Sequence, residues 1–432
     1  MKKKKTLRLL VLVTMTVLLA TSAWAGGLYN YEVGSDDTGL ASAGYASRAQ
    51  DASTLFTNPA GMTRLDQSQL SVAAAAWYLG TKFSPNSNTS ASNLTVPDGT
   101  AAARGNASQL IPAGGLFSVF KLSDKFAAGF GVFAFFGGPT QYADNSVMRY
   151  HCIESLLQGI TVMPSLAFKI SDKFSVGAGL NAMYSQLDNK VAVNNRTILN
   201  PTAPDGQIEI QDNEWGYGGK FGVLFQPTKE TRFGATYLTQ TKMDFSATPT
   251  KTDITRPLLD ALIGNRNINA TMRAPQQVIV SGYHDLTDSV AVMADLGWEN
   301  WANFGQVTIQ VNDFPPGGIT TTTHYSNTWH VAVGTQIKPS DPWKISFGFA
   351  YDSSMCDGVS RSPSLPIGQQ WRFATGAQHV ISPTMTLSAA YEYIWSGDLP
   401  MDVQGGPLSG RIAGQFDDVY MQVFNVILNW KF

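Results

Sequence analysis

Apolar side chains alternate with polar or small ones along most of the chain after residue 68. In one such segment Phe174, Val176 and Leu180 share one face, and Ser175 and Asn181 share the other. A period of two residues is that of a β-strand. Segments of this kind fall at 68–83, 109–121, 125–138, 159–170, 173–187, 213–227, 230–246, 269–286, 288–311, 320–338, 342–354, 369–381, 384–397 and 417–432. The pattern therefore predicts an all-β fold of about fourteen antiparallel strands, each with one apolar face.

The connections between these strands are of two kinds. Residues 122–126 and 170–174 carry nearly the same short polar turn, and weaker copies recur further along the chain. Other connections are longer and polar, among them 84–108, 189–212 and 314–323. Short turns at one end and long loops at the other are typical of outer-membrane barrels, in which an even number of strands leaves both termini at the periplasmic end. The sequence therefore predicts a closed transmembrane antiparallel β-barrel.

The composition favours such a barrel over a helical membrane protein. Charged residues make up 14% of the chain, aromatic residues make up 11%, and there are 40 glycines. No stretch after residue 26 has the ~20 consecutive apolar residues that a transmembrane helix needs. Sparse charge with many aromatic and small residues suits a barrel whose outer face meets lipid. A large soluble all-β protein outside the cytoplasm is the alternative class.

The first 25 residues have the pattern of a secretory signal peptide. Lys2 to Lys5 and Arg8 are basic, residues 9–20 are apolar, and residues 23–25 form a small-x-small cleavage site. An uncleaved membrane anchor is the alternative, but the apolar run is short for a spanning helix. Removal of residues 1–25 leaves 25 Lys/Arg against 32 Asp/Glu, a net charge of −7 that gives no support to nucleic-acid binding. We therefore expect the mature protein in the outer membrane of a Gram-negative bacterium.

The segment 51–62, just before the first strand, carries an unusual turn sequence. Pro59 after Asn58 stops regular structure, because the proline ring removes a backbone donor and pushes the preceding residue towards extended geometry. Asp51 and Asn58 have short side chains that bond nearby backbone groups in tight turns. The plain alternative is a turn that only leads into the first strand.

Together with the small residues at 39–46, this segment resembles the N-terminal hatch of the FadL-type outer-membrane transporters of fatty acids and other hydrophobic compounds. In that family an Asp-Ala pair and an Asn-Pro-Ala turn lie in a plug inside the barrel. The resemblance thus implies hatch and gating roles for Asp51, Ala52, Asn58, Pro59, Ala60 and Gly61. It extends at low density to 213–218, 231–237, 280–283, 298–301 and 348–352, with Arg361 and Trp371.

The same resemblance implies how the chain is divided and what it does. It implies a hatch over 26–67 that plugs the lumen of a barrel over 68–432. It also implies passive uptake of long-chain fatty acids or of aromatic or aliphatic hydrocarbons. In the family these compounds leave the barrel sideways into the membrane after the plug has shifted.

The third strand contains Gly129, Gly131, Gly137, Gly138 and Pro139. Glycine weakens strand pairing and often marks a bulge or a bend. A kink in the third strand opens the wall sideways in FadL-type transporters, so the resemblance implies a lateral opening here. Tight packing of the glycines against the plug is the alternative.

One loop has a helical pattern at 255–264. Pro257 suits a first helical turn, and Gly264 suits a stop. Four apolar residues then form one stripe: Leu258, Leu259, Leu262 and Ile263. The stripe either packs on the rim of the barrel or forms an external hydrophobic groove where a ligand first lands, which is the role that the family resemblance implies.

One departure from the family concerns the ligand. Fatty-acid members resemble this chain through 179–184 and then place a basic residue that can anchor a carboxylate, whereas Ser185 and Gln186 follow here. A charged head group in a desolvated site would lose a partner worth a few kcal/mol. A neutral hydrocarbon therefore competes with a fatty acid as the expected ligand.

The chain ends on a strand with two different faces. Phe424, Val426, Leu428, Trp430 and Phe432 share the apolar face, opposite Asn425, Asn429 and Lys431. A terminal phenylalanine on such a strand resembles the signal by which the outer-membrane assembly machinery recognises its clients. The resemblance implies that this machinery is a partner, through Phe432.

Motifs for catalysis, metals or cofactors do not stand out in the sequence. It contains no His-Glu-x-x-His, Cys-x-x-Cys, Gly-x-Ser-x-Gly or phosphate loop. Cys152 and Cys356 fall in predicted loops, and we expect free thiols rather than a bridge. We therefore expect a protein that is not an enzyme and has no cofactor, with membrane lipid and a hydrophobic small molecule as partners. A general porin, a receptor or adhesin, and an outer-membrane lipid hydrolase are the alternatives.

Overall fold

The computed structural model describes residues 27–432 apart from 90–104, 198, 258–259, 262–263, 265, 312–313 and 406–408. Two predictions lie outside these described residues: the signal peptide at 1–25, and the loop stripe of Leu258, Leu259, Leu262 and Ile263. None of the helices in the described part is long and apolar enough to cross a membrane.

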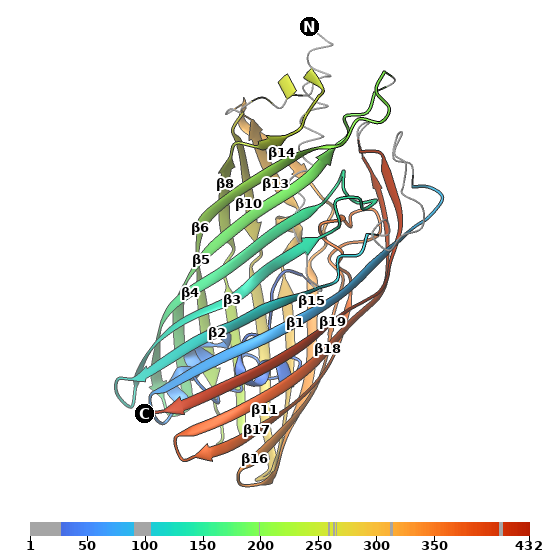
Figure 1. Cartoon of the computed structure of the whole chain (residues 1–432). Helices are drawn as coiled ribbons and strands as arrows, with labels where there is room; N and C mark the ends of the chain where they lie inside the picture. Colours follow the sequence, from blue (N-terminus) through green and yellow to red (C-terminus); the bar gives the residue numbers. More distant parts are fainter. Residues whose placement is uncertain are drawn as a thin grey trace.

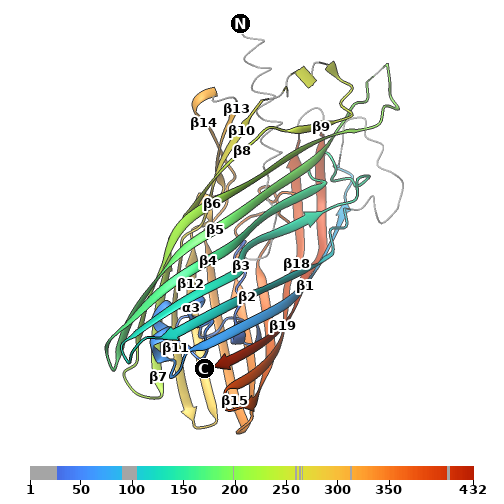
Figure 2. The ribbon, with the colours of Figure 1, turned by 60° about the vertical axis from the view of Figure 1, so that its left-hand side comes forward.

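The chain forms a closed antiparallel barrel whose strands are strongly tilted (Figure 1 and Figure 2). The strands are β1 (Gln69–Pro85), β2 (Gln109–Lys121), β3 (Phe126–Gln141), β4 (Glu154–Ser171), β5 (Phe174–Val193), β6 (Gly206–Phe225), β7 (Thr231–Leu238), β8 (Thr241–Ala247), β9 (Thr250–Thr252), β10 (Ile268–Ala274), β11 (Gln277–Thr287), β12 (Val290–Glu299), β13 (Gln306–Val311), β14 (Phe314–Thr322), β15 (Thr328–Ser340), β16 (Trp343–Asp352), β17 (Gln370–Ser382), β18 (Met385–Gln404) and β19 (Arg411–Lys431).

The ring closes because β1 pairs with both β2 and β19, and β5 pairs with both β4 and β6. Four crossings of the wall consist of two successive strands each: β7 with β8, β10 with β11, β12 with β13, and β14 with β15. The short strand β9 is an addition to β6 beyond these crossings. The wall described here therefore has fourteen crossings, and the predicted fold class and strand number are confirmed.

The two faces of the wall differ as the alternation predicts. On β19 the side chains of Phe424, Val426 and Trp430 are about half exposed, whereas Asn425 and Asn429 between them are buried. Outward-facing aromatic and aliphatic side chains recur on the other strands of the ring. Such an apolar outer face is what a barrel needs in order to lie in lipid.

Short turns join the strands at the end of the barrel that carries the C-terminus, and the longer connections lie at the other end (Figure 1). Several strands are longer than the pattern predicted. The ladder between β5 and β6 runs up to the pair Val193 and Gly206, so the predicted loop 189–212 shrinks to 194–205, and the predicted loop 314–323 contains β14. Outside the membrane both faces of a strand meet water, so the apolar alternation ends before the hydrogen-bonded ladder does.

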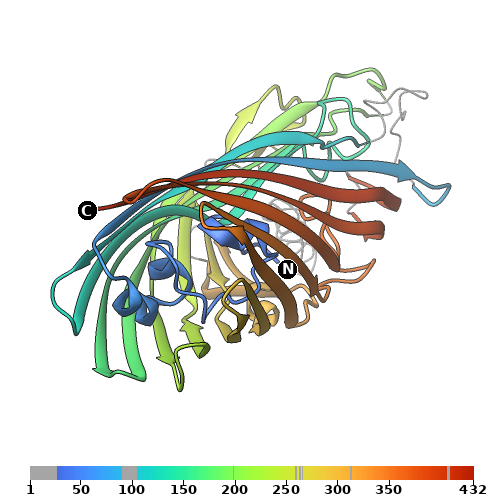
Figure 3. The same ribbon diagram turned by 90° about the horizontal axis from the view of Figure 1, so that it is seen from below.

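Residues 27–67, called the hatch from here on, lie inside the barrel near the end that carries the C-terminus (Figure 3). The hatch contains α2 (Ser35–Gly39), α3 (Thr54–Thr57) and the 3-10 helix η1 (Pro59–Arg64). Leu28, Leu40, Leu55 and Phe56 are completely buried. Such short helices have no core of their own, so the hatch is held by what the wall offers it.

Candidate functional site where the hatch meets the wall

The Asn58-Pro59 turn ties the hatch together and to the wall. Asn58 precedes η1, and its Oδ1 accepts a hydrogen bond from the Ala60 backbone N–H at 3.0 Å. Its Nδ2 donates to the backbone oxygens of Ala46 at 2.6 Å and of Val223 at 3.0 Å. One side chain thus caps a helix, joins two hatch segments and reaches β6, and proline follows it at the first helical position, where its missing N–H costs nothing.

Asp51 makes a second local turn. Its Oδ1 accepts hydrogen bonds from the N–H of Ser53 at 2.9 Å and from the Ser53 hydroxyl at 2.6 Å. Asn429 of β19 donates to its Oδ2 at 3.4 Å. The residues predicted for the hatch from the sequence, Asp51, Ala52, Asn58, Pro59, Ala60 and Gly61, are all buried within the lumen. Their gating role stays a prediction.

Glycines on the lumen face of the wall let the hatch backbone come close. A Cβ on Gly222 of β6 would lie 1.9 Å from Asn58 Oδ1, and one on Gly348 of β16 would lie 1.9 Å from the carbonyl carbon of Leu40. Only glycine leaves room for such an approach. Glycines of the wall therefore serve the packing of the hatch at these places.

A group of buried charges joins the hatch to the wall. Arg372 of β17 forms ion pairs with Glu32 of the hatch, with Asp352 at 2.5 Å and with Glu392 at 3.4 Å, and His330 lies 2.6 Å from Asp352. We call these five residues the charged clasp. Each of their side chains is at most 6% exposed. Removing one partner from such a buried network is strongly destabilising, because it leaves a charge without compensation.

Two further contacts hold the middle of the hatch. Lys344 of β16 forms an ion pair with Asp36 at 2.7 Å. The carboxylate of Asp295 on β12 accepts hydrogen bonds from the backbone N–H groups of Gly44 and Tyr45, both at 3.0 Å. None of these polar side chains was predicted from the sequence. The signal for them is a charged residue at a lumen-facing position of a strand whose other lumen-facing residues are small.

The strand β3 is bent by a bulge. It pairs with β4 along its whole length, but Phe135 is an extra residue between Ala134 and Phe136, which take neighbouring partners. Gly137 follows with φ of +73°, in the left-handed region that glycine adopts without strain. A bulge of this kind bends its strand and disturbs the ladder. This β3 kink, residues 134–137, lies within the segment predicted for a lateral opening.

The wall loses one of its ladders at the same place. Pairing between β2 and β3 runs from Lys121 with Ala127 only as far as Gly115 with Phe133. Beyond that point β2 stays paired with β1 up to Gln109, and β3 stays paired with β4. The backbone ladder between the two neighbours thus ends in the half of the barrel that lies towards the long connections, where the side chain of Gln109 still donates to the Pro139 oxygen at 2.6 Å.

The first residues of the hatch bind the backbone of the β3 kink. The N–H of Asn30 donates to the Phe135 oxygen at 2.9 Å, and the N–H of Gly137 donates to the Leu28 oxygen at 2.7 Å. Asn30 Nδ2 donates to the Gly137 oxygen at 3.1 Å, and the ring of Tyr29 stacks on that of Phe135 with centroids 4.6 Å apart. The start of the hatch therefore acts as a short extra strand on the kink.

Of the five residues predicted for the lateral opening, Gly137 is the one at the bend. A Cβ on Gly129 or Gly131 would meet hatch side chains at 2.5 and 2.9 Å, so the packing alternative accounts for these two. Gly138 and Pro139 lie past the bulge and pair with β4. Pattern alone did not separate these roles, because both need a glycine on the same strand.

Aromatic rings gather beside the β3 kink. The ring centroids of Tyr29, Phe136 and Trp301 lie 5.6–6.5 Å apart, and Phe304 lies 5.4 Å from Trp301. Trp301 and Phe304 belong to α5 (Trp301–Phe304), a helical turn between β12 and β13. The sequence predicted one continuous strand over 288–311, and this was wrong. The interruption turns the indole into the lumen, where its Nε1 donates to Glu299 at 2.5 Å.

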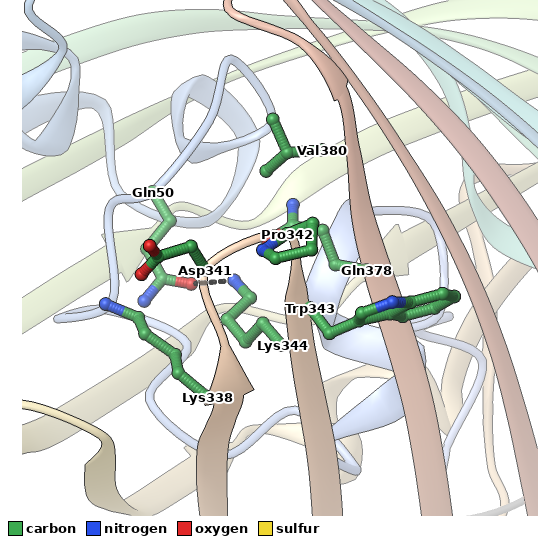
Figure 4. Close-up of a pocket in the computed structure, with 8 residues that line it drawn as sticks. All are labelled: Gln50, Lys338, Asp341, Pro342, Trp343, Lys344, Gln378 and Val380. Atoms are coloured by element: carbon green, nitrogen blue, oxygen red, sulfur yellow. Dashed lines mark hydrogen bonds between the residues drawn. The ribbon is translucent and has the colours of Figure 1, made fainter.

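The lumen is polar at the end that carries the C-terminus. A pocket of about 270 Å³ lies there, lined by Gln50, Lys338, Asp341, Pro342, Trp343, Lys344, Gln378 and Val380 (Figure 4). Lys344 Nζ donates to Gln50 Oε1 at 2.9 Å. A second pocket of about 500 Å³ shares Gln50 and Lys338 and includes Arg64 and Arg232. Charged and polar side chains of this kind stay hydrated, because burying them without partners is costly. This end of the lumen therefore does not offer an apolar route to the periplasm.

The remaining reactive groups considered from the sequence are the two cysteines and possible metal ligands. Cys152 and Cys356 are free and buried, in the connections between β3 and β4 and between β16 and β17. The described residues contain no group of three His, Cys, Asp or Glu side chains that could hold a metal ion.

Known proteins resemble this chain over nearly its whole length. The family model described as "Outer membrane protein transport protein (OMPP1/FadL/TodX)" matches residues 16–419. The long-chain fatty acid transport protein of Escherichia coli O6:H1 is 24% identical over 431 residues, covering 93% of this chain and 90% of that relative. A solved FadL homologue of Pseudomonas aeruginosa has a TM-score of 0.83 at 20% identity and covers 94% of this chain and 100% of its own. The solved Ralstonia pickettii toluene transporter TbuX has a TM-score of 0.64 at 17% identity, covering 93% and 99%.

Proposed function

This chain belongs to the outer membrane protein transport family (OMPP1/FadL/TodX), and on that premise we propose that it admits hydrophobic small molecules across the outer membrane by passive diffusion. The ligand binds from the outside and enters the upper lumen above the hatch. The first residues of the hatch then withdraw from the β3 kink. The ligand leaves sideways, between β2 and β3, into the membrane.

The observation that supports this proposal is the end of the ladder between β2 and β3 beside the β3 kink, to which hatch residues 28–30 are bonded in addition to β4. Leu28 and Asn30 make three hydrogen bonds to the kink. A neutral hydrogen bond contributes about 1 kcal/mol net, so most of the cost of detaching this segment comes from exposing the buried side chains of Leu28 and Tyr29. The charged clasp behind it is far more expensive to break, so the rest of the hatch stays in place.

The polar pockets at the C-terminal end of the lumen support a sideways exit. A hydrocarbon that left towards the periplasm would pass the charged side chains of Arg64, Lys338 and Lys344. Transfer of apolar surface from lipid-like surroundings into water costs roughly 25 cal/mol per Å². Release into the membrane avoids this cost.

The relatives support hydrophobic small molecules as the ligand class but differ in the compound for which each is named. One relative is named for long-chain fatty acids and one solved structure for toluene, so fatty acids and aromatic or aliphatic hydrocarbons are both within the proposal. A general porin needs an open lumen, and the buried hatch speaks against it. On this proposal the protein is a channel and not an enzyme. Export would use the leader at 1–25, and assembly would use the C-terminal strand that ends at Phe432.

The β3 kink gives the test. Deletion of Phe135 removes the extra residue of the bulge, so β3 can straighten and pair with β2, whereas Phe135→Ala keeps the bulge and removes only the ring. We expect cells with the deletion variant to lose uptake of labelled oleate and toluene, and cells with Phe135→Ala to keep most of it. Outer-membrane levels and heat-modifiable migration on gels confirm that both variants fold. Normal uptake by the folded deletion variant would contradict sideways release.

A further inference from the structure

Lys220 is a buried lysine on the lumen face of β6. Its side chain has no exposed surface. Its Nζ donates a hydrogen bond to the hydroxyl of Tyr45 at 3.1 Å and lies 4.9 Å from the ring centroids of Tyr45 and Phe56. The ring of Phe135, the extra residue of the β3 kink, is 5.8 Å away. We call Lys220 and these three rings the lysine cage.

The lysine cage lacks a carboxylate of the kind that pairs with Lys344 and Arg372, a property that it shares with buried Arg232, which stacks on Tyr283. None of the ion pairs among the described residues includes Lys220, whereas Lys344 pairs with Asp36 and Arg372 with the acids of the charged clasp. Asp37 acts on Lys220 through its charge but is bound to Arg48. An ammonium group has three donors, and the hydroxyl of Tyr45 uses one of them.

A buried charge is costly unless it is paired, and the faces of aromatic rings compensate only part of that cost. Such a group gains strongly from an anion that can reach it without water. The hatch side of the cage consists of two side chains, Tyr45 and Phe56, whose rotation would uncover the ammonium group.

A row of packed phenyl rings extends from the lysine cage to the place where the ladder between β2 and β3 ends. The ring of Phe56 lies 4.7 Å from that of Phe133 and 6.4 Å from that of Phe117, and Phe117 and Phe133 are 5.4 Å apart. Phe133 is the last residue of β3 that pairs with β2. A head group at Lys220 therefore places a hydrocarbon tail along phenyl rings towards the gap in the wall.

We propose that Lys220 binds the carboxylate of a long-chain acid inside the barrel, with Tyr45 and Phe56 turning aside to admit it, and so selects acids over neutral hydrocarbons. This rests on the proposed function, since the ligand must already enter the lumen. Lys220 would also supply the basic residue that fatty-acid members of the family have where this chain has Ser185 and Gln186. The anchor comes from the next strand, where Lys220 pairs with Gly179 of β5.

The experiment compares binding of labelled oleate and labelled oleyl alcohol to the full-length protein purified in detergent. The two ligands share a tail and differ in the charge of the head group. We expect the unmodified protein to prefer oleate by about 10- to 100-fold, the range of a desolvated charge-assisted contact. Lys220→Met should remove this preference by weakening oleate alone, and Lys220→Arg should keep part of it. The control is Lys242→Met, since Lys242 is exposed and paired with Asp244 at 2.7 Å; it should keep the full preference.

The outcomes separate the anchor from the channel. Equal weakening of both ligands in Lys220→Met would mean that the lysine only packs against the hatch, and would overturn the proposal. An unmodified protein that binds oleate and oleyl alcohol equally would overturn the anchor but leave the proposed function standing. If the unmodified protein binds neither these ligands nor toluene, the proposed function itself fails.

Discussion

Residues that face the lumen hold the hatch in two ways: glycines leave room for its backbone, and polar side chains form hydrogen bonds with it. Glycines such as Gly222 and Gly348 give space, because the hatch backbone lies where their Cβ atoms would be. Polar residues such as Asn58 and Asp295 then use that closeness to bond the hatch backbone directly. Close approach and hydrogen bonding depend on each other, since a bond of 3.0 Å cannot form across an added side chain.

Replacement of one of these glycines should loosen the hatch without unfolding the barrel. In Gly348→Val the new side chain overlaps the backbone at Leu40, and overpacking of this kind costs about 1–3 kcal/mol. We expect Gly348→Val to raise the ion conductance of the protein in planar bilayers. Gly282→Val is the matched control, because a Cβ there would first meet the ring of Phe233 at an ordinary 3.7 Å. Equal conductance of both variants would show that the contact at Leu40 does not secure the hatch.

At the scale of elements, the connections at the end far from the C-terminus form a core of their own. The connection between β3 and β4 packs Met148 and Cys152 against Leu399 of β18 and Phe416 of β19. These strands extend well past the turns of their neighbours (Figure 1). The long strands thus carry a layer of connections that packs on them through a hydrophobic cluster distinct from that of the hatch.

His151 should make this layer sensitive to acid. Burial lowers the pKa of His151 to about 4, although the backbone oxygens of Ser409 and Gly410 act against it. An exposed histidine has a pKa near 6.5, so the folded layer holds the ring neutral. The stability that it contributes, up to roughly 3 kcal/mol, is complete above pH 6.5 and is lost as the pH falls towards 4.

Limited proteolysis at pH 7.5 and pH 5.0, with fragments read by mass spectrometry, measures this effect. We expect faster cleavage in 142–153 and near 409–410 at the lower pH. His151→Phe keeps a buried ring but cannot take up a proton, so its cleavage should change less with pH. An unchanged pH dependence in that variant would assign the sensitivity to other groups.

At the scale of the whole molecule, the barrel and the hatch depend on each other unequally. The wall closes through ladders between neighbouring strands, none of which includes the hatch except at the β3 kink, where Tyr29 bridges Phe136. The hatch, in contrast, is buried by the wall and bonded to it through the charged clasp, Lys344 and Asp295. The barrel should therefore stand alone, whereas the hatch should not.

Deletion of residues 26–64 tests this asymmetry. We expect the remaining barrel to fold, because water entering the empty lumen can solvate Arg372, Lys344 and Asp295, which the hatch otherwise pairs. The open lumen should let small polar solutes leak from liposomes, as measured by swelling or conductance. Leakage no greater than that of the intact protein would contradict the plug.

Much of this architecture follows from local sequence. Alternation with a period of two depends only on neighbouring residues, so it was enough to predict the fourteen crossings, the apolar outer face of β19 and the turns at one end. The Asn58-Pro59 turn was also accessible, because turn chemistry acts within a few residues. The position of 51–61 inside the lumen was implied by the family resemblance.

The features that bear on transport were decided by the tertiary structure. Which glycine bends β3 depends on the register of β4 and on where β2 stops pairing, and neither is written in the strand itself. The charged clasp joins Glu32 to Arg372 across 340 positions of the chain. The sequence shows Lys220 only as a lysine within a strand. Its aromatic surroundings arise when Tyr45 and Phe56 of the hatch pack against it in the folded chain. The sequence by itself determined the barrel, because it rests on local periodicity, and it contained the turn at Asn58 and Pro59, whose place in a hatch was implied by the family resemblance. The gap, the clasp and the cage arose only in the folded chain, because they rest on contacts between residues that the sequence keeps far apart.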